Sequence, residues 1–448
     1  MANPSFAARP TSNEDAAGLP ARRLAATVIE EVLRARTALD ETHERLAPGF
    51  RLDTADASLA RAIAVTAFRR LGTIRQALHA RLDRGMPRKS GAFEAIMITA
   101  AAQILFLDVP DHAAVDLAIR HLQEEERSAR YASLGNAVLR RLARERDEAL
   151  AEANADLFLD TPDWLAEGWR EHYGEKVAAA IAASHREEPP LDLSVRSDAP
   201  GWAEKLDGVA LPTGSVRLNA RAAIATLPGF DEGAWWVQDA AAALPVLLIA
   251  PKPGERIADL CAAPGGKTAQ LAAAGAKVTA VDRSATRLKR LHANLARLSL
   301  EAEVIAADAA SLDAEPFDAV LLDAPCSATG TIRRHPDVAW TKLPEDRDKL
   351  SALQSRLLDA AARLTKPGGR LVYCTCSLEP EEGERQVEAF LARHPDFRRD
   401  PVRAEEIGGV TEAIDGNGDL RTLPHQIPGA NPRLSGWAGF YASRLVRL

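Results

Sequence analysis

From Glu255 onward, short apolar runs alternate with segments of helical periodicity, and this rhythm limits the possible folds more than any other feature of the chain. Five runs have the length and composition of buried strands: 256–260, 277–282, 302–308, 317–325 and 369–377. Helical segments such as 292–300 and 347–365 separate them. Such alternation is typical of a parallel sheet with helices on both faces, joined by right-handed crossovers. We therefore predict a doubly wound α/β domain of the Rossmann type.

Each of these expected strands ends at, or is followed by, an acidic or reactive residue. The residues are Asp259, Asp282, Asp308, Asp323 and Cys376. Ligands of doubly wound sheets bind outside the carboxyl ends of the strands. A single aspartate at a strand end is more often a helix cap or a turn former, so only the series indicates a binding site.

The segment "DLCAAPGGKTAQLAA" follows the first strand and opens a helix. Gly265 and Gly266 allow the backbone to approach a ligand at a helix N-terminus, which indicates a nucleotide-like ligand. The G-x-G-x-x-G order of a dinucleotide site is absent. A phosphate loop remains an alternative because the segment ends in Gly-Lys-Thr, although Cys261 stands where that loop needs its first glycine. A structural turn without a ligand is the other alternative.

The acid at the end of the second strand favours S-adenosylmethionine over ATP. Asp282 is placed to accept hydrogen bonds from ribose hydroxyls, as in other doubly wound folds. Asp308 is suited to accept from the exocyclic amine of an adenine, and Lys267 to bind the carboxylate of the methionine. A phosphate loop requires no such series of acids.

The four cysteines, Cys261, Cys326, Cys374 and Cys376, are too few for a disulfide scaffold. Cys326 and Cys376 lie at the ends of two strands that can be neighbours, so we expect both thiols to face one pocket. Cys374 lies deeper on the same strand face and is expected to be a small buried hydrophobe. A zinc site is excluded because the spacing is C-x-C and no second close pair of ligands exists. We expect no metal.

Four segments, "DLCAAPGGKT", "VDRSATRL", "DAPCSATGTIRRHPD" and "CTCSLEPEEGE", resemble in this order the Sun-type (Nol/Nop/Sun) RNA cytosine-5 methyltransferases. The resemblance covers about residues 235–448. It implies a Rossmann-type catalytic domain, S-adenosylmethionine as methyl donor, and C5 of a cytidine in 16S ribosomal RNA as acceptor. The chain departs from the family near its C-terminus, where Ala438 replaces part of an Asp-Gly-Phe pattern and extra residues precede it.

The resemblance also implies roles for individual residues. Cys376 is the nucleophile that adds to C6 of cytosine, Cys326 assists product release, and Asp323 hydrogen-bonds the base. The reverse assignment of the two cysteines stays open, because DNA cytosine methyltransferases use a Pro-Cys thiol like that of Cys326. Together with the strand-end positions, the resemblance gives these candidate cofactor-binding residues: Cys261, Ala262, Ala263, Pro264, Gly265, Gly266, Lys267, Asp282, Arg287, Asp308 and Asp323.

The chain before the catalytic domain divides by pattern into three parts. Residues 1–20 are expected to be a disordered tail, and 21–150 an all-α domain of about five helices. The segment "SLGNAVLRRLARE" resembles the NusB-like RNA-binding domain carried by a bacterial 16S ribosomal RNA methyltransferase of this family. Residues 155–235 are expected to form a small α+β linker domain that opens with one helix over 163–185, and 236–448 the catalytic domain.

Charge and hydropathy bear on the expected partners and location. The 56 Lys and Arg against 63 Asp and Glu give a net charge of −7, so an RNA surface must be a local patch. Candidates are Arg69, Arg70, Arg140, Arg141, Arg333, Arg334 and His335. The longest apolar stretch, 92–109, is interrupted by polar residues and suits a buried helix. We expect a cytoplasmic monomer that binds RNA and no membrane; an RNA-binding module with an inactive methyltransferase fold is the competing interpretation.

Overall fold

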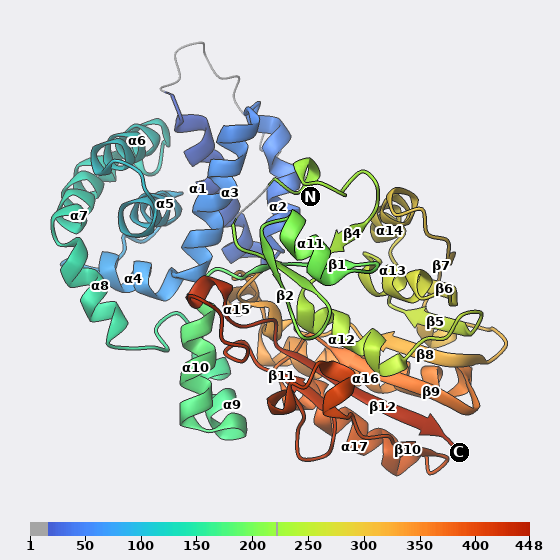
Figure 1. The fold of residues 1–448 in the computed structure, drawn as a ribbon. Helices are drawn as coiled ribbons and strands as arrows, with labels where there is room; N and C mark the ends of the chain where they lie inside the picture. Colours follow the sequence, from blue (N-terminus) through green and yellow to red (C-terminus); the bar gives the residue numbers. More distant parts are fainter. Residues whose placement is uncertain (1–16, 221–222) are drawn as a thin grey trace, which may run out of the picture. The chain divides into compact units, whose positions relative to one another are not determined.

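The computed structural model describes residues 17–220 and 223–448. The chain falls into two compact units (Figure 1). The first contains the chain up to Glu167 together with His335–Lys342, and the second contains Gly168–Arg334 and Leu343–Leu448. Most of the predicted tail, residues 1–16, lies outside the described residues, and the first helix begins at Leu19.

The described residues of the first unit form helices and the loops between them. Its helices are α1 (Leu19–Ala35), α2 (Leu39–Leu46), α3 (Thr54–Arg69), α4 (Leu71–His79), α5 (Phe93–Phe106), α6 (Asp111–Glu124), α7 (Ala132–Arg144), α8 (Arg146–Asn154) and α15 (Val338–Thr341). The apolar stretch of the sequence forms α5, which is buried almost throughout and packs against α1, α3, α6 and α7. This confirms its prediction as a core helix.

The helix count in this unit exceeds the five that periodicity predicts, because two long periodic segments are each divided. One of them breaks at Arg70, where the backbone leaves helical geometry (φ −123°, ψ 30°). The carboxylate of Asp160 accepts the backbone N–H of Thr73 at 2.8 Å and Nε of Arg70 at 3.0 Å. A distant residue thus caps the start of α4. Local periodicity cannot predict such a cap. The other break lies at Glu145, between α7 and α8, and α2 was not predicted.

The first unit is discontinuous in sequence. Its last helix, α15, directly follows the segment "DAPCSATGTIRRHPD" that contains Cys326. The backbone N–H of Leu39 donates to Asp337 at 3.0 Å, and the indole of Trp340 donates to the carbonyl of Phe68 at 2.9 Å. Residues 335–342 are therefore an integral part of the helical core.

The second unit contains a small antiparallel sheet. Its strands are β1 (Leu191–Val195), β2 (Gly208–Ala210), β3 (Val216–Leu218) and β4 (Trp235–Val237), in the order β2-β3-β1-β4. Helix α11 (Ala199–Lys205) joins β1 to β2, and α9 (Asp163–Tyr173) and α10 (Glu175–His185) precede the sheet. The single helix expected over 163–185 is wrong: Gly174, with φ 79°, divides it. Only glycine adopts such a φ readily.

A large sheet forms the rest of the second unit. Its strands are β5 (Arg256–Leu260), β6 (Lys277–Asp282), β7 (Glu303–Ala306), β8 (Phe317–Asp323), β9 (Thr365–Thr375), β10 (Phe397–Arg399), β11 (Leu420–Thr422) and β12 (Phe440–Arg447). The strand order is β10-β12-β9-β8-β5-β6-β7, and β11 pairs with β12. Strands β5 to β9 pair in parallel, whereas β12 is antiparallel to β9. The order reverses direction between β5 and β8, which makes the carboxyl ends of these strands the expected ligand site.

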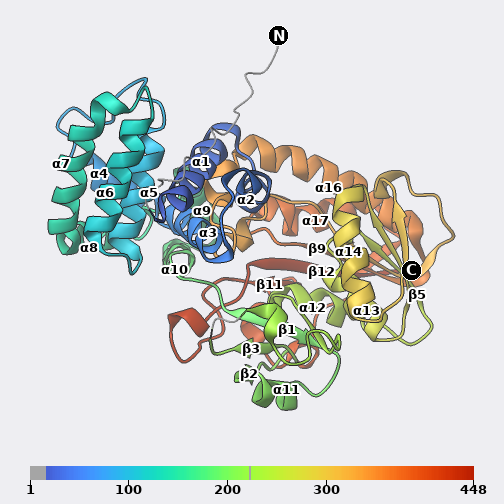
Figure 2. The same ribbon diagram turned by 90° about the horizontal axis from the view of Figure 1, so that it is seen from above.

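Helices cover both faces of the large sheet (Figure 2). They are α12 (Ala240–Ile249), α13 (Gly266–Ala273), α14 (Ala285–Arg297), α16 (Pro344–Leu364) and α17 (Glu384–Arg393). Alternate strand residues point to opposite faces: Leu321 and Val372 belong to the core with α12, and Leu322 and Leu371 to the core with α16. The predicted Rossmann-type architecture is confirmed.

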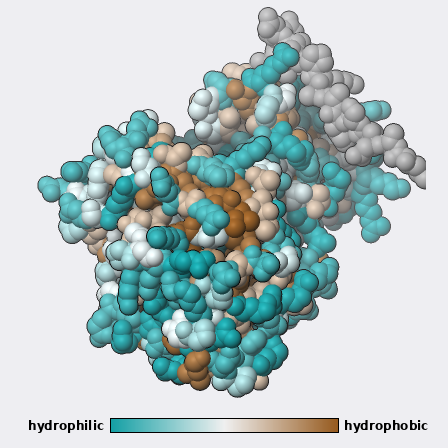
Figure 3. Space-filling view, turned by 90° about the vertical axis from the view of Figure 1, so that its right-hand side faces the viewer, coloured by the Kyte–Doolittle hydropathy of each residue, from teal (hydrophilic) through white to brown (hydrophobic). Residues whose placement is uncertain are grey.

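Hydrophilic side chains cover much of the molecular face in Figure 3, around a central hydrophobic area. Within the described ranges, no helix is both long enough and apolar enough to span a membrane.

Candidate active site

A sharp backbone turn joins β5 to α13. Cys261 and Gly265 both have positive φ, 63° and 103°. A Cβ at Gly265 would lie 2.9 Å from Cγ of Leu291, so glycine is required here for space as well as for conformation. At Gly266 a Cβ would make only ordinary contacts. Helix α13 begins at Gly266, and the N–H groups of its first turn have no acceptor within the helix. They are available to a ligand.

Asp282 ends β6 beside this turn and is 3% exposed. Its carboxylate accepts the backbone N–H groups of Ala263 (3.2 Å) and Ser284 (2.8 Å). Arg287 lies 3.2 Å from the same carboxylate and donates to the carbonyl of Ala263. The structure therefore brings Ala263, Asp282 and Arg287 together, as the sequence predicts.

Two other strand-end acids differ in their surroundings. Asp308 is exposed and caps a short turn by accepting the N–H of Ala310 at 2.9 Å. Asp259 is fully buried, and burial raises its pKa to about 7 although the Thr268 hydroxyl donates to it at 2.6 Å. Its second oxygen, Oδ1, has no hydrogen-bond partner among the described residues. Asp259, two residues before Cys261, is thus a buried acid, and one of its oxygens accepts no hydrogen bond from the described residues.

Lys267 links the turn to the end of β8. Its ammonium donates to Oδ2 of Asp323 at 2.8 Å and lies 4.9 Å from the centre of the Phe440 ring. Burial acts to lower the pKa of Lys267, but the carboxylate of Asp323 outweighs it and the net pKa is raised. The side chain of Asp323 remains 32% exposed. Local sequence patterns do not indicate this pair or the contact with Phe440, because Lys267, Asp323 and Phe440 are far apart along the chain.

The two candidate catalytic thiols face each other. Sγ of Cys326, just beyond β8, lies 3.4 Å from Sγ of Cys376, just beyond β9, and both residues are half-buried. The hydrogen bond to Cys376 and burial raise the pKa of Cys326. Cys374 is fully buried within β9, which agrees with the prediction of a small hydrophobe, and burial raises the pKa of its thiol. Burial and nearby carboxylates also raise the pKa of Cys261 to about 12.

The divergent C-terminal segment packs against the loop that follows Cys326. The N–H of Gly439 donates to the carbonyl of Gly330 at 2.8 Å. A Cβ at Gly330 would lie 1.9 Å from the carbonyl oxygen of Gly439. Ala438 is buried, and its N–H donates to Asp239 at 3.1 Å. The backbone of this segment therefore supports the Cys326 loop.

Most arginines proposed for RNA contact have structural roles. Arg333 is buried and donates to the backbone carbonyls of Glu188 and Pro432 at 2.7 and 2.9 Å. Arg334 pairs with Asp239 at 2.9 Å. In this structure the two guanidinium groups therefore join segments of the second unit, and RNA contact by these arginines stays a prediction.

The candidates in the first unit also differ from one another. Arg69 is buried, Arg70 pairs with Asp160, Arg141 pairs with Glu145 at 2.8 Å, and His335 lies 3.5 Å from Asp40. Arg140 is exposed, lies 3.9 Å from Asp116, and lines a groove of about 420 Å³ between α6 and α7, together with Asp116, Arg120 and Asn136. This groove is the best remaining candidate for RNA contact in the helical unit.

Comparison with known proteins adds to this picture. The family profile "16S rRNA methyltransferase RsmB/F" matches residues 246–444, and that of the NusB family matches 19–144. Ribosomal RNA small subunit methyltransferase B of Cronobacter sakazakii is 36% identical over 89% of this chain and 96% of its own length. The protein of the same name from Pasteurella multocida is 34% identical over 96% of each chain.

Solved structures share the fold. The crystal structure of PH0851 aligns with a TM-score of 0.74 at 23% identity, covering 97% of this chain and all of that one. A methyltransferase homologue from Pyrococcus horikoshii aligns with a TM-score of 0.54 at 26% identity, covering 65% of this chain and 98% of its own.

Proposed function

The chain belongs to the RsmB/F family of 16S rRNA methyltransferases, and on this premise we propose that it transfers the methyl group of S-adenosylmethionine to C5 of a cytidine in 16S ribosomal RNA through a covalent cysteine–C6 adduct. The observation that carries the proposal is the 3.4 Å separation of Cys326 and Cys376 at the ends of adjacent parallel strands. In this proposal residues 21–150 bind RNA, 155–235 link the domains, and 236–448 perform the chemistry. The enzyme acts as a cytoplasmic monomer.

C5 of cytosine is a poor nucleophile, so the ring must be activated before C5 can accept a methyl group. Addition of a thiolate to C6 converts the ring to an enamine-like nucleophile that accepts a methyl cation equivalent at C5. In our proposal Cys376 attacks C6. The raised pKa of Cys326 keeps that thiol protonated, so its S–H is placed to donate to the sulfur of Cys376. After methyl transfer the C5 proton passes to solvent water, the electrons of the C5–H bond re-form the C5=C6 double bond, and Cys376 leaves C6 as a thiolate. The S–H of Cys326, 3.4 Å away, can stabilise this departing thiolate by a hydrogen bond.

Asp323 and Lys267 are proposed to hold the base. Asp323 lies at the carboxyl end of β8, three residues before Cys326, and its carboxyl group is partly accessible. A carboxyl group there can hydrogen-bond N3 and the exocyclic amine of cytosine, and offset charge that develops as the thiolate adds. The ammonium of Lys267 fixes the position of that carboxyl group through the 2.8 Å contact.

The β5–α13 turn fits S-adenosylmethionine. Leu291 leaves little room for a side chain at Gly265, and the N–H groups at the start of α13 suit a carboxylate. We propose that residues 261–267 hold the methionine part, Asp282 and Arg287 the ribose, and Asp308 the adenine. When bound, the cofactor supplies an electrophilic methyl group on a sulfonium. Lys267 is also proposed to contact the methionine carboxylate, although its partner in this structure is Asp323.

The RNA must present an unstacked cytosine to these thiols. Extrusion of a base costs about a few kcal/mol and is least costly in loops and single strands. The groove beside Arg140 is proposed to hold part of the same RNA by contacts to its phosphates.

The test is methylation of unmodified 16S ribosomal RNA with purified protein and labelled S-adenosylmethionine, the product being mapped by bisulfite sequencing. Cys376→Ala should abolish turnover, and Cys326→Ala should accumulate a protein–RNA adduct that survives a denaturing gel. An adduct with Cys376→Ala and none with Cys326→Ala would reverse the two roles. Tight binding of magnesium-ATP without binding of S-adenosylmethionine would instead support the phosphate-loop alternative.

A further inference from the structure

We infer that Glu382 is a positioning residue that sets the spacing of the two active-site thiols, by binding the serine that follows each of them. Cys326 is followed by Ser327, and Cys376 by Ser377. The inference rests on the proposed function for the roles of the thiols. The hydrogen bonds between Glu382 and the two serines do not depend on those roles.

One carboxylate joins the two strand-end loops. Oε1 of Glu382 accepts the backbone N–H of Ser327 at 2.9 Å. Oε2 accepts the hydroxyl of Ser377 at 2.6 Å and also the hydroxyl of Ser327. The two serine hydroxyls lie 3.2 Å from each other. Because both loops bind the same side chain, neither can shift without disturbing the other.

The site around Glu382 is closed to solvent. Glu382, Ser327 and Ser377 are all 0% exposed. Nε2 of Gln354, from α16, donates both to Oε1 of Glu382 (3.1 Å) and to the carbonyl of Pro325 (2.9 Å). The hydrogen bonds to the carboxylate thus come from hydroxyl and amide groups. Burial of a carboxylate against such donors is expensive, which favours a functional reason for its presence over a purely structural one.

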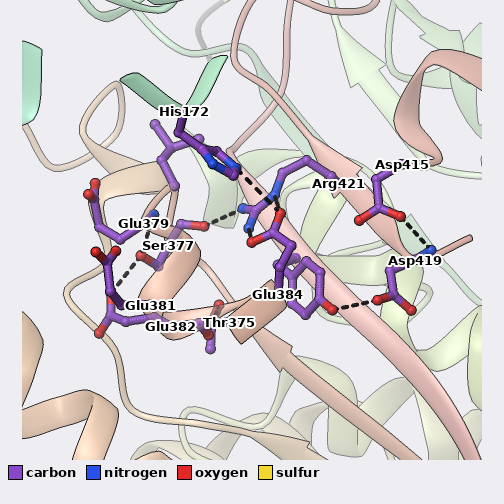
Figure 4. A network of polar contacts seen from close by, with 12 residues as sticks. His172, Thr375, Ser377, Glu379, Glu381, Glu382, Glu384, Asp415, Asp419 and Arg421 are labelled. Atoms are coloured by element: carbon purple, nitrogen blue, oxygen red, sulfur yellow. Dashed lines mark hydrogen bonds and ion pairs between the residues drawn. The ribbon is translucent and has the colours of Figure 1, made fainter. Parts of the chain in front are cut away.

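Other contacts hold the Cys376 loop from its far side (Figure 4). Arg421 donates to the backbone carbonyl of Ser377 at 2.6 Å and pairs with Glu384 at 2.7 Å. The N–H of Gly330 donates to the carbonyl of Cys376 at 3.0 Å. These bonds fix the backbone of the loop. Glu382 adds a side-chain bond to both serines at once.

Precise spacing matters for the chemistry proposed. One sulfur must reach C6 while the other stays within reach of the same ring, and a misplacement of about 1 Å can cost about 10²-fold in rate. The sequence hides this role, since Glu382 belongs to the acidic run "EPEEGE", which by composition suits a solvated loop.

The experiment compares Glu382→Ala, Glu382→Gln and, as a matched control, Glu381→Ala. The side chain of Glu381 pairs with Arg347 and Arg385. Two quantities are measured: kcat and KM for methylation, and the affinity for phenylarsine oxide without RNA or cofactor. This reagent bridges two neighbouring thiols, forming two As–S bonds and releasing its oxygen with both thiol protons as water. The Cys326→Ser variant lacks one of the two thiols, so it gives the affinity of the arsenical for a site that the reagent cannot bridge.

We expect Glu382→Ala to lower kcat by about 10²-fold, with KM for S-adenosylmethionine nearly unchanged, and to weaken arsenical binding by at least about tenfold. Glu382→Gln should remain within about threefold in both, because its amide oxygen accepts from Ser327 and Gln354 while its NH₂ donates to the two hydroxyls. Glu381→Ala should match the wild type.

Equal impairment of the Gln and Ala variants, or a Glu382→Ala protein with wild-type kcat and arsenical affinity, would overturn the inference. If Glu382→Ala fails to fold, the Ser327→Ala/Ser377→Ala double variant replaces it, and wild-type values there would also overturn it. Weak arsenical binding by the variant together with a wild-type protein that methylates no RNA would reject the proposed function and leave the positioning role intact.

Discussion

Replacement of Glu384 by glutamine should destabilise the second unit by about 3 kcal/mol at neutral pH. Glu384 begins α17 and forms a two-point contact with Arg421 on β11, at 3.0 Å and 2.7 Å. The two side chains are 13% and 6% exposed. Burial acts to raise the pKa of Glu384, but Arg421, with a smaller contribution from His172 at 3.9 Å, outweighs it, and the pKa falls from 4.5 to about 2. That depression corresponds to about 3 kcal/mol of folding free energy.

The sign and the pH window follow from the same shift. A carboxyl group whose pKa is lower in the folded state stabilises the protein fully above its unfolded value of 4.5, and this contribution is lost as the pH falls toward 2. Removal of one partner of a buried ion pair costs about 3–5 kcal/mol, which is a similar magnitude.

Urea denaturation followed by tryptophan fluorescence measures the effect, since Trp169, Trp235 and Trp437 are buried in the second unit. Glu388→Gln, an exposed position on the same helix, is the control. At pH 7.5 the Glu384→Gln protein should unfold at clearly lower urea than the control. The gap should shrink below pH 4.5, to roughly half at pH 3. Equal midpoints for the two variants at pH 7.5 would refute the argument.

Three further changes test the site. Cys374→Ala should keep methylation within about threefold of wild type, because the thiol is fully buried and its contact with Oδ1 of Asp323 is a weak S–H hydrogen bond of 3.5 Å; a complete loss of turnover would contradict this. Gly265→Ala should weaken S-adenosylmethionine binding in calorimetry by at least about tenfold, since the φ of 103° and the 2.9 Å approach to Leu291 both disfavour a side chain; unchanged affinity would argue against this site for the cofactor. Gly330→Ala should lower kcat with little change in cofactor affinity, because its Cβ would meet the carbonyl of Gly439 at 1.9 Å and displace the Cys326 loop; unchanged kcat would show that the loop adapts.

Much of the large sheet could be predicted from sequence, because its strands are continuous apolar runs bounded by polar turns. The strand expected over 256–260 agrees with β5, and 277–282 with β6. The order of the strands in the sheet could not be predicted in this way. That β12 lies between β9 and β10, antiparallel to both, depends on pairing between distant segments, which the local pattern of Phe440–Arg447 does not encode.

The candidate site was predictable where residues lie at strand ends and less so where partners are distant. Cys326 and Cys376 meet because β8 and β9 are adjacent. The role of Glu382 and the pairing of Lys267 with Asp323 were not predicted, because these contacts join residues tens of positions apart. The structural contacts of Arg333 were not predicted for the same reason: the carbonyls that bind it come from segments more than ninety residues distant.

The discontinuity of the helical unit affects how it can be separated from the rest of the protein. A gene fragment that stops at Glu167 encodes this bundle without α15. The N–H of Leu39 then loses its hydrogen bond to Asp337, and the carbonyl of Phe68 loses its hydrogen bond from the indole of Trp340. Recombination at a single site could not transfer the complete bundle to another gene, because α15 is encoded within the sequence of the second unit. Inheritance of the two units is thereby tied together.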